Sequence, residues 1–163
     1  MKKVYGAEGR HDGLYRIGRE KYEAIIGYGQ DEMGGYNYRE TFRHLPTVEE
    51  VRARYHEVIN EEVQEKILNG LEYEGHLVWL DAASQRNYLA KAVQVQSGAD
   101  VLPIEVKLGT DEAPYHKTFT TAEDYLAFFN VIQDHITTAQ HDGWEVKEMV
   151  EWPDFEEAKE VCE

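Results

Sequence analysis

Residues 71–89 read LEYEGHLVWLDAASQRNYL and decide the fold, because they contain a complete hairpin and the start of a helix. Apolar, β-prone residues stand on either side of Glu74-Gly75, where glycine can take a positive φ and close a tight turn. Asp81 then offers a carboxylate that can cap the helix carrying Tyr88. The stretch therefore predicts a β-hairpin followed directly by a helix.

The order hairpin then helix occurs three times along the chain. Thr47 and Thr121 are each followed three residues later by an acidic residue, which is typical of a capped helix start. Antiparallel pairs that are each followed by a helix favour an α+β fold, an antiparallel sheet of short hairpins with three main helices packed on it. The expected hairpins cover residues 22–42, 71–80 and 101–119, and the expected helices cover 47–68, 82–96 and 121–143.

The chain divides, on this reading, into one main α+β domain at residues 46–143, a β-rich N-terminal segment at 1–45 and a C-terminal extension at 144–163. Pro153 suits the first position of a short helix in that extension. A chain of 163 residues can bury a core without metal or disulfide support. We therefore expect one domain with two appended segments.

Gly27-Tyr28-Gly29 has the beginning of a dinucleotide-binding loop. Glu32 stands where that pattern requires a third glycine, and no helix follows within reach. The tripeptide is interpreted as part of a plain hairpin.

Seventeen basic and thirty-two acidic residues give a formal net charge of −15. Such a surface repels phosphates and anionic lipids, so no nucleic-acid or membrane partner is expected. The N-terminus has no apolar signal-peptide core, and the single cysteine, Cys162, fits a reducing compartment. The expected location is the cytoplasm or a virion.

The sequence predicts no catalytic residue, metal site or cofactor. There is no Gly-x-Ser-x-Gly elbow, P-loop or HExxH motif, and the histidines follow no ligand spacing. A small hydrolase whose site is assembled from distant residues stays open. The histidines are His11, His44, His56, His76, His116, His135 and His141.

Gln85 lies on the same expected helical face as Tyr88 and Ala92. Its amide should therefore point partly inward, where it needs hydrogen-bond partners. Our hypothesis is that Gln85 bonds backbone groups of the adjoining hairpin and ties the helix to it; contact with a ligand is the alternative.

Four aromatic residues are candidates for contact with a protein partner, because Trp and Tyr dominate interface hot spots. Closing one end of the core is the alternative role for the tryptophans. The four are Tyr36, Tyr38, Trp144 and Trp152.

Between residues 47 and 139 the chain carries turn and cap positions at fixed spacings. They are Tyr73-x-Gly75, Asp81-x-x-Ser84-Gln85-x-Asn87, Lys107 with Gly109-Thr110-Asp111, and Thr121-x-x-Asp124-Tyr125-Leu126. This set resembles a domain family of unknown function that is common in phage and prophage proteins near tail and tail-fibre genes, in particular its Bacteroides-type versions. The second hairpin departs from the family, because GTDEAP replaces a tight Asp-Gly turn.

The family has no established activity, so the resemblance implies a setting and no mechanism. We expect a non-enzymatic phage- or prophage-derived protein, a tail-associated structural or assembly factor that binds a protein partner or associates with itself. The small hydrolase and an acidic decoy of a nucleic-acid-binding protein are the alternatives. The residues expected to form the structural or binding signature are Tyr73, Gly75, Asp81, Ser84, Gln85 and Asn87.

Overall fold

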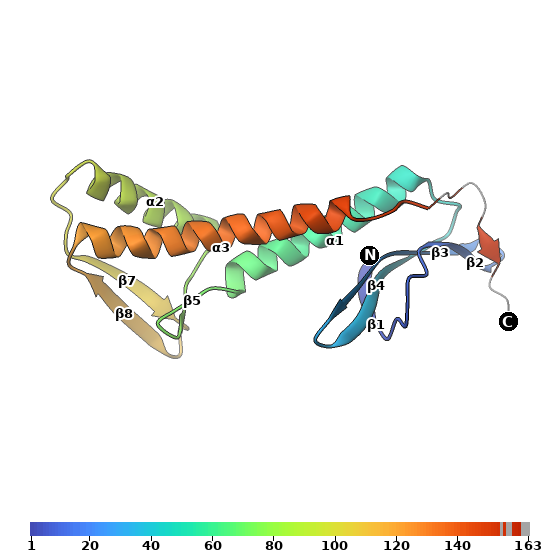
Figure 1. Ribbon diagram of the computed structural model, residues 1–163, viewed down its shortest axis with the longest axis horizontal. Coiled ribbons are helices and arrows are strands. Elements are labelled where there is room, and N and C mark those ends of the chain that lie inside the picture. The colour runs from blue at the N-terminus through green and yellow to red at the C-terminus, as the bar shows by residue number, and fades with distance from the viewer. Residues whose placement is uncertain (154, 156–157, 161–163) are drawn as a thin grey trace. The chain divides into compact units, whose positions relative to one another are not determined.

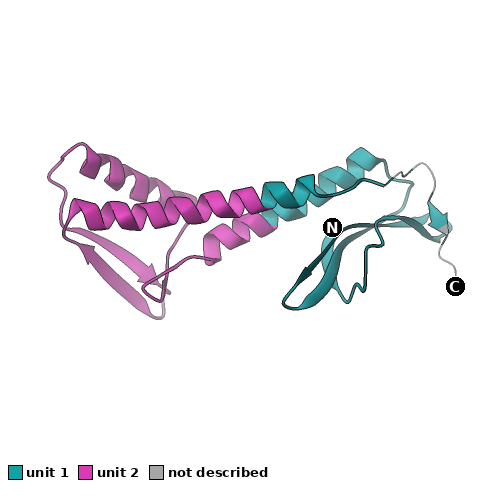
Figure 2. Ribbon diagram, in the orientation of Figure 1, with its two compact units in different colours: residues 1–61, 143–163 teal, residues 62–142 magenta. Residues whose placement is uncertain are grey.

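The computed structural model describes residues 1–153, 155 and 158–160. They form two compact units, shown in Figure 2: unit 1 comprises residues 1–61 and 143–163, and unit 2 comprises residues 62–142. Helices α1 (Val48–Asn69) and α3 (Ala122–Glu148) each contribute residues to both units. The boundary expected after residue 143 lies within one residue of the observed one, whereas the boundary expected at residue 45 lies at residue 61, and both ends of the chain belong to one unit.

The α+β fold and the hairpin–helix order are as the sequence predicts. The hairpins form three separate sheets rather than one, as Figure 1 shows. Unit 1 contains a five-stranded sheet in the order β1-β4-β3-β2-β9. Its strands are β1 (Lys2–Tyr5), β2 (Gly13–Gly18), β3 (Lys21–Asp31), β4 (Gly34–Phe42) and β9 (Lys159–Glu160).

The expected hairpin of unit 1 is confirmed, since residues 22–28 lie in β3 and 36–42 lie in β4. All strand pairs in this sheet are antiparallel except β2–β9, which is parallel. A short helix beginning at Pro153 was expected, but Pro153, Phe155 and Ala158 are outside regular structure and β9 follows them. The helix prediction is wrong for these residues, and Lys159 and Glu160 after them pair with Tyr15 and Arg16 of β2. Residues 154, 156–157 and 161–163 lie outside the described part.

Unit 2 contains two short antiparallel hairpins, β5 (Glu72–Tyr73) with β6 (His76–Leu77), and β7 (Ile104–Gly109) with β8 (Pro114–Phe119). In the first turn, both Glu74 (φ 52°) and Gly75 (φ 78°) have positive φ. A two-residue turn of this kind matches the right-handed twist of its strands. Helix α2 (Ala82–Gln96) follows with the bounds that the sequence predicts.

Helices α1 and α3 begin at the expected caps. The Glu50 backbone N–H donates to Thr47 Oγ1 at 3.2 Å. Thr121 Oγ1 accepts from the Asp124 backbone N–H at 3.2 Å and donates to the Asp124 carboxylate at 2.7 Å. These bonds satisfy backbone donors that a helix start leaves free.

Helix α3 was expected to end at Gly143, but it continues to Glu148. A glycine inside a helix costs only about 1 kcal/mol relative to alanine. Contacts of the following turn within unit 1 compensate for this, because Tyr55 donates its hydroxyl to the Val146 carbonyl at 3.4 Å and Lys147 donates to Asn60 at 2.5 Å.

The core of unit 2 contains the apolar face predicted for α3. Tyr125, Phe128, Ile132 and Ala139 are fully buried, and they pack with Leu80, Tyr88 and Leu108 among others. The Tyr125 hydroxyl donates to the Tyr88 carbonyl at 3.0 Å and so joins α3 to α2. Burial of these side chains is the main stabilising contribution in the unit. None of the helices in the described residues has the length and apolar character needed to cross a membrane.

Candidate functional site

The polar signature begins with Asp81, which caps α2. Its carboxylate accepts hydrogen bonds from the backbone N–H groups of Ala83 (2.9 Å) and Ser84 (3.1 Å), and from Ser84 Oγ (2.6 Å). The bond from the Ser84 hydroxyl, followed by the bond from its backbone N–H, lowers the pKa of Asp81. Asp81 and Ser84 therefore fix the first turn of the helix.

Gln85 makes the backbone contact that the sequence predicted. Its Nε2 donates to the Leu80 carbonyl oxygen at 2.6 Å, and Leu80 is the last residue of the expected hairpin region. The Leu80 side chain is buried in the core. This bond ties the start of α2 to the chain leaving β6.

Tyr73 and Gly75 also have structural surroundings. The Tyr73 ring packs edge-on against Phe128, with centroids 4.9 Å apart, and Gly75 occupies the turn between β5 and β6. The predicted signature thus separates into two groups. Tyr73, Gly75, Asp81 and Gln85 join secondary elements, whereas Ser84 and the exposed Asn87 line a cavity.

This cavity has a volume of about 400 Å³ and lies within unit 2. Its size falls within the range of small-molecule sites. One side comes from α2, where Ser84, Asn87, Tyr88 and Lys91 follow a spacing of three, four and seven residues and therefore share one face. The remaining lining residues are Trp79, Ile104, Glu105, Val106, Lys107 and Tyr125.

Trp79 and Lys107 form one wall of the cavity. The Trp79 indole N–H donates to the Gly109 carbonyl, which fixes the ring against the end of β7. Lys107 Nζ lies 4.6 Å from the centroid of that ring and 2.9 Å from Asp111 Oδ1. The positive charge of Lys107 is therefore shared with a carboxylate and an aromatic face.

The other charged lining residues differ in their partners. Glu105 lies 2.9 Å from His116 Nδ1 on the neighbouring strand. Lys91 forms no ion pair within the described part of the chain, whereas Lys3, Lys66 and Lys117 are each paired with a carboxylate.

Two tyrosine hydroxyls of the lining stay protonated over a wide pH range. Burial raises the pKa of Tyr125 to about 12, and the charge of the nearby Tyr88 adds to this. Burial, followed by the charge of Asp81, also raises the pKa of Tyr88. The Tyr88 hydroxyl therefore stays a donor near neutral pH, whereas the Tyr125 hydroxyl already donates to the Tyr88 carbonyl.

The sequence missed Trp79, Lys91 and Glu105 as members of one site. The spacing of Ser84, Asn87 and Lys91 on one helical face was a signal that could have grouped three of the polar residues. Trp79 and Glu105 line the same cavity because the fold brings β7 and the residues before α2 to it. The spacing of residues along the chain does not predict this arrangement.

The four candidate interface aromatics all lie in unit 1 but differ in exposure. Tyr38 is only 2% exposed, so the expectation that its side chain lies on the surface is wrong: its ring packs between those of Tyr36 and Tyr55. Trp152 is half-buried, with its ring 5.9 Å from that of Tyr55. Tyr36 is half-buried as well, whereas Trp144 is 59% exposed.

A second cavity, of about 240 Å³, lies within unit 1, and four tyrosines are among its lining residues. Met149, which is 74% exposed, also lines it. Further lining residues are Arg10, Tyr28, Tyr36, Tyr38, Tyr55, Val146 and Val150.

Gly27 and Gly29 allow these tyrosine rings to approach β3. Gly27 has a φ of +68°, and a Cβ there would lie 2.8 Å from the hydroxyl oxygen of Tyr55. A Cβ on Gly29 would collide with the Tyr36 ring. The Gly27-Tyr28-Gly29 tripeptide is therefore part of the β3–β4 hairpin, at an irregularity in its register.

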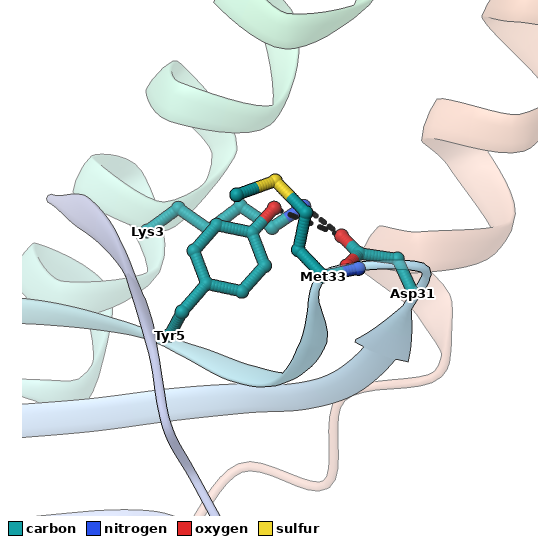
Figure 3. A network of polar contacts seen from close by, with 4 residues as sticks. All are labelled: Lys3, Tyr5, Asp31 and Met33. Carbon is teal, nitrogen blue, oxygen red and sulfur yellow. Dashed lines mark hydrogen bonds and ion pairs between the residues drawn. The ribbon is translucent and has the colours of Figure 1, made fainter.

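A polar network fixes β1 beside the turn of that hairpin, as Figure 3 shows. Asp31 accepts hydrogen bonds from Lys3 Nζ (3.1 Å), the Tyr5 hydroxyl (2.9 Å) and the Met33 backbone N–H (2.9 Å). Desolvation acts to raise the pKa of Asp31, but these hydrogen bonds, that of Lys3 first, together lower it. The network is structural, because its hydrogen bonds join β1 to the turn between β3 and β4.

Metal-ligand atoms come close together at one place on α3. His141, Asp142 and Glu145 have such atoms within 4.8 Å of one another. Lys66 Nζ lies 2.5 Å from Asp142 Oδ2, and that hydrogen bond lowers the pKa of Asp142. An ammonium at this distance competes with a cation, so the cluster gives little support for a metal site.

Comparison of the chain with protein-family models, with curated proteins and with solved structures finds no match. The functional interpretation of the two cavities therefore rests on their geometry and lining residues.

Proposed function

We propose that the protein is a non-enzymatic structural or assembly factor of a phage or prophage tail, and that it acts by binding a protein. The resemblance of residues 47–139 to tail-region proteins supports this setting. The observation that carries the binding role is the tyrosine-lined cavity of unit 1 with the exposed Met149 at its edge.

The chemistry of this cavity suits a side chain of a protein partner. Its volume of about 240 Å³ lies below the range typical of drug-sized ligands, and an aliphatic or aromatic anchor residue can enter it. Tyrosine and methionine are enriched at protein interfaces, where methionine adapts its shape to a partner. The net charge of −15 favours a partner with a basic surface.

Size-exclusion chromatography with light scattering tests the proposal. The chain is measured alone and after co-expression with candidate tail-fibre segments. A defined oligomer or a complex of fixed stoichiometry is the expected result. A chain that stays monomeric and binds none of these segments contradicts the proposal.

Two methionines provide a matched pair of variants. Met149→Ser removes an apolar side chain from the edge of the cavity, and Met33→Ser removes one that is 76% exposed in the β3–β4 turn, outside the cavity lining. Loss of a well-packed interface side chain typically weakens binding by 1 kcal/mol or more, about fivefold or more in Kd. We expect Met149→Ser to weaken the complex and Met33→Ser to leave it unchanged; equal effects would refute the role of the cavity.

A further inference from the structure

The cavity of unit 2 has mostly apolar walls, and several of its polar side chains lie along one face of α2. Ile104, Val106 and Trp79 contribute apolar surface, and Ser84, Asn87 and Lys91 follow one another along α2. Sites for small organic molecules have this composition: mostly apolar, with a few polar groups that orient the ligand. We infer that this cavity binds a small organic monocarboxylate with an apolar body, and that Lys91 is its charge partner.

Lys91 supplies the positive charge. The acidic groups around the cavity are engaged elsewhere: Asp81 with the start of α2, Glu105 with His116, and Asp111 with Lys107. No carboxylate in the described part of the chain pairs with Lys91. In a chain with fifteen more acidic than basic residues, an ammonium without an acidic partner beside an apolar cavity is suited to an anion from outside.

The charge balance favours a ligand with a single negative charge. Of the two lysines in the lining, Lys107 is paired with Asp111, whereas Lys91 has no acidic partner among the described residues; the carboxylate of Glu105 also belongs to the lining and opposes a second negative charge on the ligand. A phosphate monoester, which carries close to two charges near neutral pH, fits this balance less well than a carboxylate does.

Uncharged donors complete the site. The Asn87 amide and the Tyr88 hydroxyl line the cavity and make no hydrogen bond among the residues that the structure describes. They can donate to a carboxylate oxygen, which accepts several hydrogen bonds at once. Ser84 is less available, because its hydroxyl already donates to Asp81.

This inference is independent of the proposed tail-assembly role. Every residue of this cavity belongs to unit 2, whereas the tyrosine-lined cavity with Met149 belongs to unit 1. Partner binding and carboxylate binding can therefore fail separately in the two experiments.

Calorimetric titration of the full chain with 2-naphthoate tests the site, with the uncharged 2-naphthamide as the matched probe. We expect 2-naphthoate to bind with a Kd below about 1 mM and about tenfold more tightly than 2-naphthamide, since a charge-assisted hydrogen bond is lost with the amide. The indole N–H signal of Trp79, assigned with Trp79→Phe, should shift in ¹H–¹⁵N spectra. Absence of binding, equal binding of both probes or an unmoved Trp79 signal would overturn the inference.

A lysine pair gives the matched variants. Lys91→Met keeps the length of an exposed side chain and removes its charge, so the fold should be retained. Lys21→Met makes the same change at an exposed position of β3 in unit 1. We expect Lys91→Met to weaken 2-naphthoate about tenfold without changing 2-naphthamide, and Lys21→Met to change neither. Unchanged affinity of Lys91→Met for 2-naphthoate would exclude Lys91 as the charge partner.

Discussion

Asp81 shows how one side chain can combine a structural role with a pH dependence. Its carboxylate accepts two backbone N–H groups and the Ser84 hydroxyl, and these bonds lower the pKa of Asp81. A lowered pKa in the folded state means that the ionised form stabilises the fold. This contribution is fully present above the unfolded-state pKa of about 3.9 and is lost as the pH falls through the lowered folded-state pKa.

Asp81→Ala should therefore lower the melting temperature by several degrees at pH 7, because the cap is lost, and by less near pH 3, which lies below the unfolded-state pKa of about 3.9, so that part of the stabilisation by the ionised form is already lost. Thermal denaturation at both pH values measures the difference. Asp100→Ala, in the exposed loop before β7, is the control and should have little effect at either pH. A destabilisation by Asp81→Ala that is the same at both pH values would show that ionisation of the cap contributes nothing.

At the scale of an element, β3 depends on Gly27 for its irregular register. The backbone there has a φ of +68°, and the buried Tyr55 ring from α1 leaves no space for a Cβ. Gly27→Ala should lower the free energy of unfolding by about 1–2 kcal/mol for the left-handed backbone alone, and by more because of the contact with Tyr55.

Urea denaturation measures this change. Gly9→Ala is the matched control, because a Cβ at Gly9 would meet no atom within 4 Å and the backbone there has no positive φ. It should leave the unfolding free energy within about 0.5 kcal/mol of the wild type. If Gly27→Ala is as stable as Gly9→Ala, the strand does not require glycine at this position.

The helices and hairpins that the sequence predicted are those whose signals are local. Thr47, Asp81 and Thr121 cap helices through bonds that span two or three residues, so their spacing is sufficient to recognise them. Strand β9 is stabilised by pairing with β2, more than a hundred residues earlier, and no local pattern contains that partner. Gly143 has the usual signature of a helix end, but tertiary contacts of the following turn outweigh its low helix propensity.

The candidate site could be predicted only in part for the same reason. The polar positions of α2 follow a regular spacing in the sequence. The predicted backbone contact of Gln85 is present, but its partner is Leu80, in the connection between β6 and α2 rather than in the hairpin itself. Trp79 and Glu105 reach the cavity only through tertiary packing between α2 and β7. Exposure was also misjudged for Tyr38, because alternation along a strand does not show which face a helix covers.

At the scale of the whole molecule, the excess of acidic residues affects stability. A net charge of −15 in a folded chain produces self-repulsion that salt can screen. Raising sodium chloride from about 20 mM to about 300 mM should raise the melting temperature by a few degrees, because the Debye length shortens over this range. Calorimetry at constant pH measures the shift.

Screening also weakens the exposed ion pairs, such as Lys66–Asp142, but exposed pairs contribute little to stability. Sodium sulfate strengthens apolar burial as well as screening charge, so sodium chloride is the cleaner reagent. A melting temperature that falls with sodium chloride would show that the attractive pairs outweigh the net repulsion.

The division of the chain into a continuous unit 2 and a discontinuous unit 1 has a consequence for biosynthesis. A ribosome completes residues 62–142 before it adds the last turn of α3, Trp152 and β9, which belong to unit 1. Strands β1 to β4 are made early and pair with one another, whereas the outer edge of β2 has to wait for β9, in reverse of the usual order in which an N-terminal region folds before the rest. Until β9 is made, that edge of β2 is unpaired and open to a ribosome-associated chaperone.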